Sequence, residues 1–239
     1  PNYIDQETTI AGTYRVFGSG TDWPSGINGN IEFNAKPQTL YGYDVENITV
    51  NAILEQGMMT LNTLSVTHDA VQLNVNGKAN MVLEKADVNI HVKVPDLSQL
   101  ADFGIEDLKG ATEIEGPLSA QWGDPIKAEY NGDLKFRRIQ HPSANILGGI
   151  GQIGVKYDDS GIRYRGRIAL DDILAAGTSI ETVRTDFEGD VSPSNEVTLN
   201  ANVAVNEVKV GDGAVHVAHL KDSPRCRRDG AARGFTPAR

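Results

Sequence analysis

Alternation of apolar and polar residues with a period of two is the feature of this sequence that most restricts its fold. From Val197 to Asn206 every odd position up to Val205 is apolar and nearly every even position is polar. Successive side chains of a β-strand point to opposite faces of a sheet, so the pattern predicts a strand with one dry and one wet face. Similar segments lie at 48–54, 71–76, 88–94 and 162–170. A slip of the alternation between Leu61 and Leu64 predicts a β-bulge.

Turn-forming residues separate these segments at spacings of roughly eight to fifteen residues, which indicates antiparallel hairpins. We expect turns at 55–57, 68–69, 76–77, 158–161 and 192–195. Two stretches favour a helical turn instead, at 95–103, where Asp96 can cap it, and at 171–176. Both are too short to cover a sheet, so the chain is predicted to be all-β and mainly antiparallel.

The apolar face of such a sheet must be buried against a second sheet, against itself or against a ligand. A second sheet would make a β-sandwich, whose core is usually anchored by large aromatic residues. Aromatic residues are only 6% of this chain, and the predicted inward positions are mostly Val, Leu, Ile and Ala. We therefore predict an elongated, curved sheet that forms an open, U-shaped hydrophobic groove, with the β-sandwich as the alternative.

The charge distribution divides the chain into two parts. The net charge is −10, yet residues 211–239 contain six basic and three acidic residues. This tail has no alternation after Val217 and is rich in Arg. We predict a β-groove segment over 1–210 and a basic tail over 211–239 that is disordered or foreign to the protein.

Composition also limits the function. An acidic chain is a poor match for nucleic acid or for an anionic membrane surface, since both select for clustered Lys and Arg. The single cysteine, Cys226, excludes a disulfide within the chain. No apolar run approaches the ~20 residues of a spanning helix, and the chain opens at Pro1 without a basic and apolar leader. We expect an excerpt or a processed product whose anchor lies outside this sequence.

A family resemblance enters at 95–139. There a "DLSQL" turn precedes "DLKGATEIEGPLSA" and then "GDPIKAEYNGDL", with Pro125 before a strand and Gly132 within the next. This resembles the repeat of the AsmA-like proteins of the TamB group, "G-x-L-x-x-x-G-x-L-x-G … P-x-x-x-G-x-L". Segments 26–79 and 180–210 resemble the strands between such units, so the resemblance covers about residues 12–210.

The resemblance implies a periplasmic location, with an anchor in the inner membrane, and a β-groove that moves phospholipid between the inner and outer membranes. It also implies a role in outer-membrane protein (autotransporter) assembly as an alternative. The expected partners are phospholipid acyl chains, outer-membrane assembly proteins and adjacent repeats of the same longer chain. The residues predicted to line the groove are Val71, Leu73, Val75, Val88, Ile90, Val92, Val197, Leu199, Val203 and Val205. A closed β-sandwich acting as an adhesin or scaffold is the rival from another class.

Glycines at 149, 151 and 154 match the G-x-G-x-x-G spacing of dinucleotide-binding sites, and Asp171 and Asp172 follow at a fitting distance. That site needs a helix after the glycines, whereas the sequence continues with a turn between strand-like segments. We therefore expect a flexible or tightly curving glycine-rich connection and no cofactor.

The other candidates for chemistry are scattered. His216, His219 and Cys226 have zinc-ligand side chains but lack a fourth partner, and we expect no metal site. The histidines at 68, 91 and 141 are interpreted as surface residues, and the acidic pairs at 158–159 and 171–172 as turn residues. The tryptophans at 23 and 122 flank turns, where each can cover the end of an apolar face. No set of polar residues converges as an active site would require, so the sequence predicts that the protein is not an enzyme.

Overall fold

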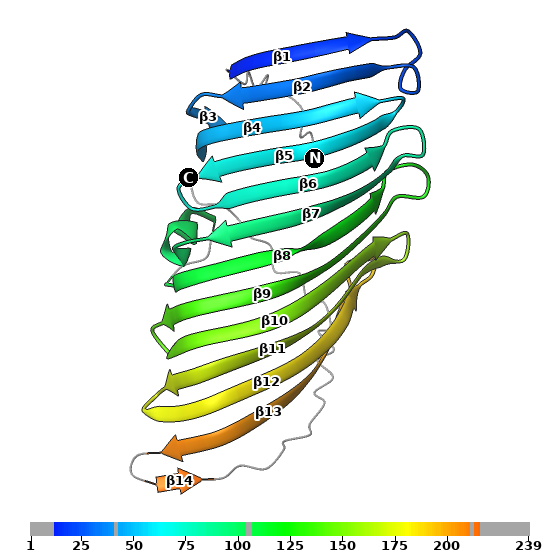
Figure 1. Ribbon diagram of the computed structural model, residues 1–239. Coiled ribbons are helices and arrows are strands. Elements are labelled where there is room, and N and C mark those ends of the chain that lie inside the picture. Colours follow the sequence, from blue (N-terminus) through cyan, green and yellow to red (C-terminus); the bar gives the residue numbers. More distant parts are fainter. Residues whose placement is uncertain (1–11, 41–42, 104–106, 211–212, 216–239) are drawn as a thin grey trace, which may run out of the picture.

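The structure is a computed structural model that describes residues 12–40, 43–103, 107–210 and 213–215. Fourteen strands form one sheet (Figure 1). The strands are β1 (Gly12–Ser19), β2 (Asn28–Ala35), β3 (Gln38–Leu40), β4 (Tyr43–Glu55), β5 (Met58–His68), β6 (Gln72–Asn80), β7 (Lys85–Val94), β8 (Lys109–Gln121), β9 (Lys127–His141), β10 (Ala144–Asp158), β11 (Gly161–Ala175), β12 (Thr178–Val191), β13 (Val197–Val210) and β14 (Gly213–Val215). A 3₁₀ helix, η1 (Leu97–Phe103), lies between β7 and β8.

The strands follow one another through the sheet in sequence order, with β3 paired to β4 beside the main path (Figure 1). Every neighbouring pair is antiparallel, from β1 with β2 to β13 with β14. The sheet is not closed, and the described residues contain no second sheet. The all-β, elongated and curved sheet is therefore confirmed, and the β-sandwich alternative is wrong. Consecutive hairpins add each new strand to the edge of the same sheet, whereas a β-sandwich needs connections that cross from one sheet to a second sheet.

Curvature follows from the size of the sheet. Adjacent strands rotate by about −20 to −25° relative to one another, and open sheets rarely exceed about ten strands without curling. The 14 strands accumulate this rotation, and the strands of the C-terminal half lie visibly tilted against those at the N-terminal end (Figure 1). At about 4.8 Å per strand the main path is about 60 Å long.

The turns and bulges were predicted in part. Gln56 and Gly57 have φ values of 49° and 81° and close the tight β4–β5 turn, as expected. The bulge between Leu61 and Leu64 is confirmed. The predicted turn at 76–77 is wrong, because both residues lie inside β6; the chain turns at 81–84 instead.

The helical predictions also divide. Asp96 caps the 95–103 turn as predicted, since its Oδ1 accepts hydrogen bonds from the Ser98 N–H (2.9 Å) and hydroxyl (2.8 Å). The helical alternative at 171–176 is wrong, because β11 continues to Ala175. Asp172 there has φ 51° at a gap in the pairing with β10 and β12, so a local irregularity in a strand interrupted the period-two pattern.

The core is thin and lies along one face of the sheet. Nine apolar residues are buried among those described, and no large side chain among them is fully buried. The buried set is Ala35, Ala52, Leu54, Ala70, Ala79, Val94, Leu97, Leu134 and Ile173. Leu97 comes from η1, which packs beside β8. Side chains on the face of a single sheet contact only one another and the sheet below them, because no second layer covers them, so they cannot be buried fully.

Of the predicted basic tail at 211–239, Gly213–Val215 form β14, which pairs with β13; the remainder lies outside the described residues. No helix in the described part of the chain has both the length and the apolar character needed to cross a membrane.

Candidate functional site

Strand register gathers most of the apolar positions of the sheet on one face; Ile53 and Ile150 are exceptions that lie on the opposite face. Direct cross-strand partners lie on the same face, so a row of partners can be followed from strand to strand. One such row, here called the apolar row, contains a single polar residue, Thr185. It runs through Ala35, Ile48, Val66, Leu73, Val92, Ile114, Leu134, Gly151, Ile168, Thr185 and Val203.

The adjacent row lies on the opposite face and is polar throughout. This polar row runs through Thr13, Asn34, Thr49, Ser65, Asn74, His91, Glu115, Asp133, Gln152, Arg167, Asp186 and Asn202. Its members bond across strands, as in Gln152 Nε2 to Asp133 Oδ1 (3.1 Å) and Arg167 Nε to Asp186 Oδ1 (2.6 Å). The sheet therefore has one apolar and one polar face over at least eleven strands.

All ten residues predicted to contact lipid lie on the apolar face, nine of them in strands and Val71 in the turn before β6. Six of them, on or just before β6 and β7, form one block, because Leu73 pairs with Val92 and Val75 with Ile90. The remaining four lie on β13, where Val197, Leu199 and Val203 are 61%, 52% and 42% exposed. The structure thus places the two blocks on the same face but separates them by β8 to β12.

The residues between the blocks were not among the sequence predictions. Ile114, Leu134 and Ile168 connect them within the apolar row. Glycines at neighbouring positions of this face are covered by rings: a Cβ at Gly132 would clash with the Tyr130 hydroxyl, and one at Gly166 would lie 2.8 Å from Phe187 Cε1. An aromatic side chain that packs over a glycine covers the exposed backbone with apolar atoms, so the face stays apolar at positions without a side chain of their own.

Tyr130 is an uncommon feature of this face. Its hydroxyl is buried and has no hydrogen-bond partner among the described residues. Burial raises the pKa of Tyr130 above its ordinary value, and the negative charges of Asp133 and Glu115 add to the rise. A phenol is neutral at physiological pH even at its ordinary pKa, and the shift moves it further from ionisation, which suits an apolar surface.

The polar face is hollowed and charged. One hollow of about 500 Å³ is lined by residues that include Asp133, Arg165, Arg167 and Asp186. Ion pairs on this face, such as Arg167 with Asp186, are largely exposed and contribute little to stability.

The other sequence candidates are placed as follows. Gly149, Gly151 and Gly154 lie inside β10, so the predicted glycine-rich connection is wrong; the alternation continues through the glycines because Gly149 and Gly151 take apolar-face positions opposite Leu170 and Ile168. Trp23 and Trp122 lie in the loops after β1 and β8 and are 69% and 42% exposed. His216, His219 and Cys226 lie outside the described residues.

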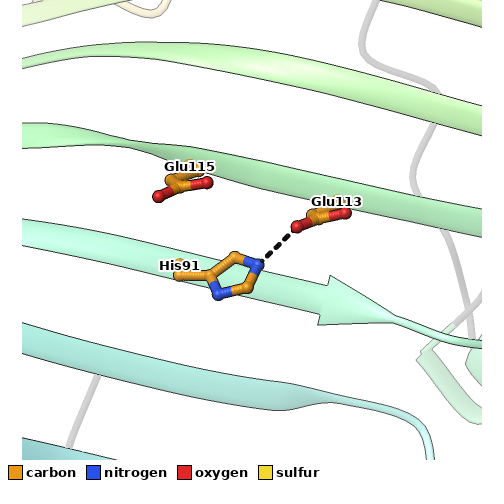
Figure 2. A group of neighbouring side chains, drawn as sticks. All are labelled: His91, Glu113 and Glu115. Atoms are coloured by element: carbon orange, nitrogen blue, oxygen red, sulfur yellow. Dashed lines mark hydrogen bonds and ion pairs between the residues drawn. The ribbon is translucent and has the colours of Figure 1, made fainter.

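The interpretation of His91 as a solvated surface residue was incomplete. It is half-buried on the polar face and meets Glu113 and Glu115 of β8 (Figure 2). Asp158 and Asp159 lie at the β10–β11 turn as expected, whereas Asp171 and Asp172 lie inside β11, so their interpretation as turn residues is wrong. The hydrogen bond from the Ser160 hydroxyl lowers the pKa of Asp158 below its ordinary value. Finding the His91 cluster from sequence would have required the β7–β8 register, which the η1 insertion conceals.

Comparison with known proteins adds no relative to this description. No family model, no curated protein and no solved structure matches the chain, so the resemblance to AsmA-like proteins stays a prediction that rests on the quoted motifs.

Proposed function

We propose that this chain is a non-enzymatic lipid-binding segment of a periplasm-spanning bridge, in which the apolar face holds phospholipid acyl chains in transit between the inner and outer membranes. The observation that carries the proposal is the apolar row, which runs unbroken except for Thr185 across a single sheet without a second layer among the described residues. A monomer rarely leaves so large a contiguous apolar surface without a partner.

The energetics favour lipid as that partner. Burying one CH₂ group contributes about 0.8 kcal/mol, so an acyl chain of about 15 such groups gains about 6 kcal/mol even when only half of it is covered. Association costs at least about 4 kcal/mol, so one chain binds marginally and the two chains of a phospholipid bind firmly but reversibly. Reversible binding along a continuous face is what transport needs.

The dimensions fit as well. β6 has 9 residues and β10 has 15, which correspond to about 30 and 50 Å at 3.3 Å per residue. The hydrocarbon of one bilayer leaflet is about 15 Å thick, half of a 30 Å core. An extended acyl chain therefore fits along a strand, with its head group in water at the strand ends.

Mass spectrometry of organic extracts from the purified full chain tests this function. We expect phospholipid at about one molecule or more per chain, at a level far above that in a β-sandwich protein purified in the same way from the same cells. An extract without phospholipid would favour the adhesin or scaffold role. Capture of unfolded outer-membrane β-strands by a lipid-free chain would favour the assembly role.

A further inference from the structure

Three side chains with metal-binding atoms meet on the polar face of the β7–β8 pair (Figure 2). His91 on β7 lies directly opposite Glu115 on β8. Glu113 precedes Glu115 by two residues and therefore projects from the same face. The arrangement is fixed by strand register and does not depend on a loop.

The distances are close to those of a metal site. His91 Nε2 lies 2.8 Å from Glu113 Oε1, and one ligand atom from each of the three residues lies within 4.8 Å of the others. A tetrahedral Zn²⁺ with bonds of about 2.0–2.1 Å holds its ligand atoms about 3.3 Å apart. Rotation of the two flexible Glu side chains covers the difference.

The charges also suit a cation. Glu113 and Glu115 bring two carboxylates next to the His91 imidazole, and the neighbouring cations Lys135 and Arg137 offset only part of the negative charge of this acidic face. The Glu115 side chain makes no hydrogen bond or ion pair with the described residues. Its carboxylate is thus available as a ligand.

A competing interaction holds Glu113. Arg137 Nη2 lies 3.4 Å from Glu113 Oε2, but the Arg137 side chain is 68% exposed, so the pair is weak. Arg137 pairs with Oε2, so a metal that displaces the proton between Glu113 and His91 can bind Oε1, the oxygen nearest His91.

A hollow with mainly polar walls and room for water lies beside His91 and Glu115. This hollow of about 250 Å³ is lined by His91 and Glu115 together with Asn74, Asn76 and Asn89. Water bound there can complete the coordination of a metal that receives three ligands from the protein.

We propose that His91 Nε2 and the carboxylates of Glu113 and Glu115 bind one Zn²⁺ ion. Imidazole with two carboxylates is a mixed N and O set that suits zinc better than the oxygen-only cations Mg²⁺ and Ca²⁺. The metal would link β7 to β8, two strands whose connection contains η1 and is not a tight turn. Because the three residues converge only in the folded sheet, Zn²⁺ binding would stabilise the sheet at this joint.

Isothermal titration of the full chain with ZnCl₂ tests the site. The tail residues His216, His219 and Cys226 can bind zinc themselves, so the background carries H216N, H219N and C226S. We expect one saturable site, and at least about tenfold weaker binding in each of H91N, E113Q and E115Q. Zn²⁺ should also raise the Tm of the background but not of H91N.

Matched controls are H141N and E188Q, which remove a histidine and a carboxylate from exposed positions elsewhere in the sheet. Both should bind Zn²⁺ within about twofold of the background. The proposal is overturned if the background binds no Zn²⁺ saturably, if H91N and E115Q bind as tightly as the background, or if MgCl₂ at equal concentration displaces the Zn²⁺. Three independent ligand variants keep the test decisive should one fail to fold by circular dichroism.

Discussion

Replacing Leu73 and Leu199 together by Asp is expected to lower crosslinking of a photoreactive phospholipid at least tenfold while the β signal in circular dichroism is retained. Both residues lie on the apolar face, on β6 and β13. Full burial of a Leu side chain contributes about 1.5–3 kcal/mol, so half of that from two residues is about 1.5–3 kcal/mol, or tenfold to more than a hundredfold in affinity. A carboxylate beside an acyl chain adds a desolvation cost.

The matched control exchanges the next residue on each strand. Asn74 and Asn200 lie on the polar face, so N74D with N200D adds the same two charges without touching the proposed lipid surface. We expect wild-type crosslinking from this control. Equal crosslinking from both double variants would mean that the lipid does not lie on the apolar face.

Gly116→Ala is expected to destabilise the sheet by at least about 2 kcal/mol, which corresponds to a Tm lower by about 4–8 °C for a chain of this size. A Cβ at Gly116 would clash with the carbonyl oxygen of Asn131 and lie 2.5 Å from Gly132 Cα. Both are backbone atoms of β9, so relief requires β8 and β9 to separate and weakens their hydrogen bonds.

Gly148→Ala is the corresponding control, because Gly148 is also a strand glycine but a Cβ there would meet only Phe136 O, at 3.7 Å. We expect a Tm that is unchanged or slightly higher, since Ala loses less conformational entropy than Gly on folding. Thermal melts followed at 218 nm measure both variants. Equal Tm values for G116A and G148A would contradict the close approach of the β8 and β9 backbones at Gly116.

The fold was predictable because a sheet with one apolar and one polar face requires apolar and polar residues to alternate along each strand. Val197 to Val205 predicted β13 and its apolar face, and the slip after Leu61 predicted the bulge in β5. Low aromatic content correctly disfavoured a sandwich. These signals are local, and consecutive hairpins convert local signals into the complete topology.

The errors arose where local signals and pairing disagree. Asn76-Gly77 is a strong turn dipeptide, yet Gly77 pairs with Leu61 and Val88 inside the sheet. The glycines of β10 suggested a connection, although their neighbours supply the missing apolar cover. The His91 cluster depends on register across η1, which no property of the single strands encodes.

A crosslinking scan along β13 tests whether phospholipid lies on the apolar face of the sheet. Benzoylphenylalanine is placed singly at 199, 201 and 203 on the apolar face and at 200, 202 and 204 on the polar face. Position 204 is a polar-face position that holds an apolar residue, Ala204. It therefore shows whether the face of the sheet or the hydrophobicity of the position determines crosslinking. We predict phospholipid adducts at 199, 201 and 203, and none at 200, 202 or 204. Adducts at 204, or adducts without a period of two, would contradict this prediction.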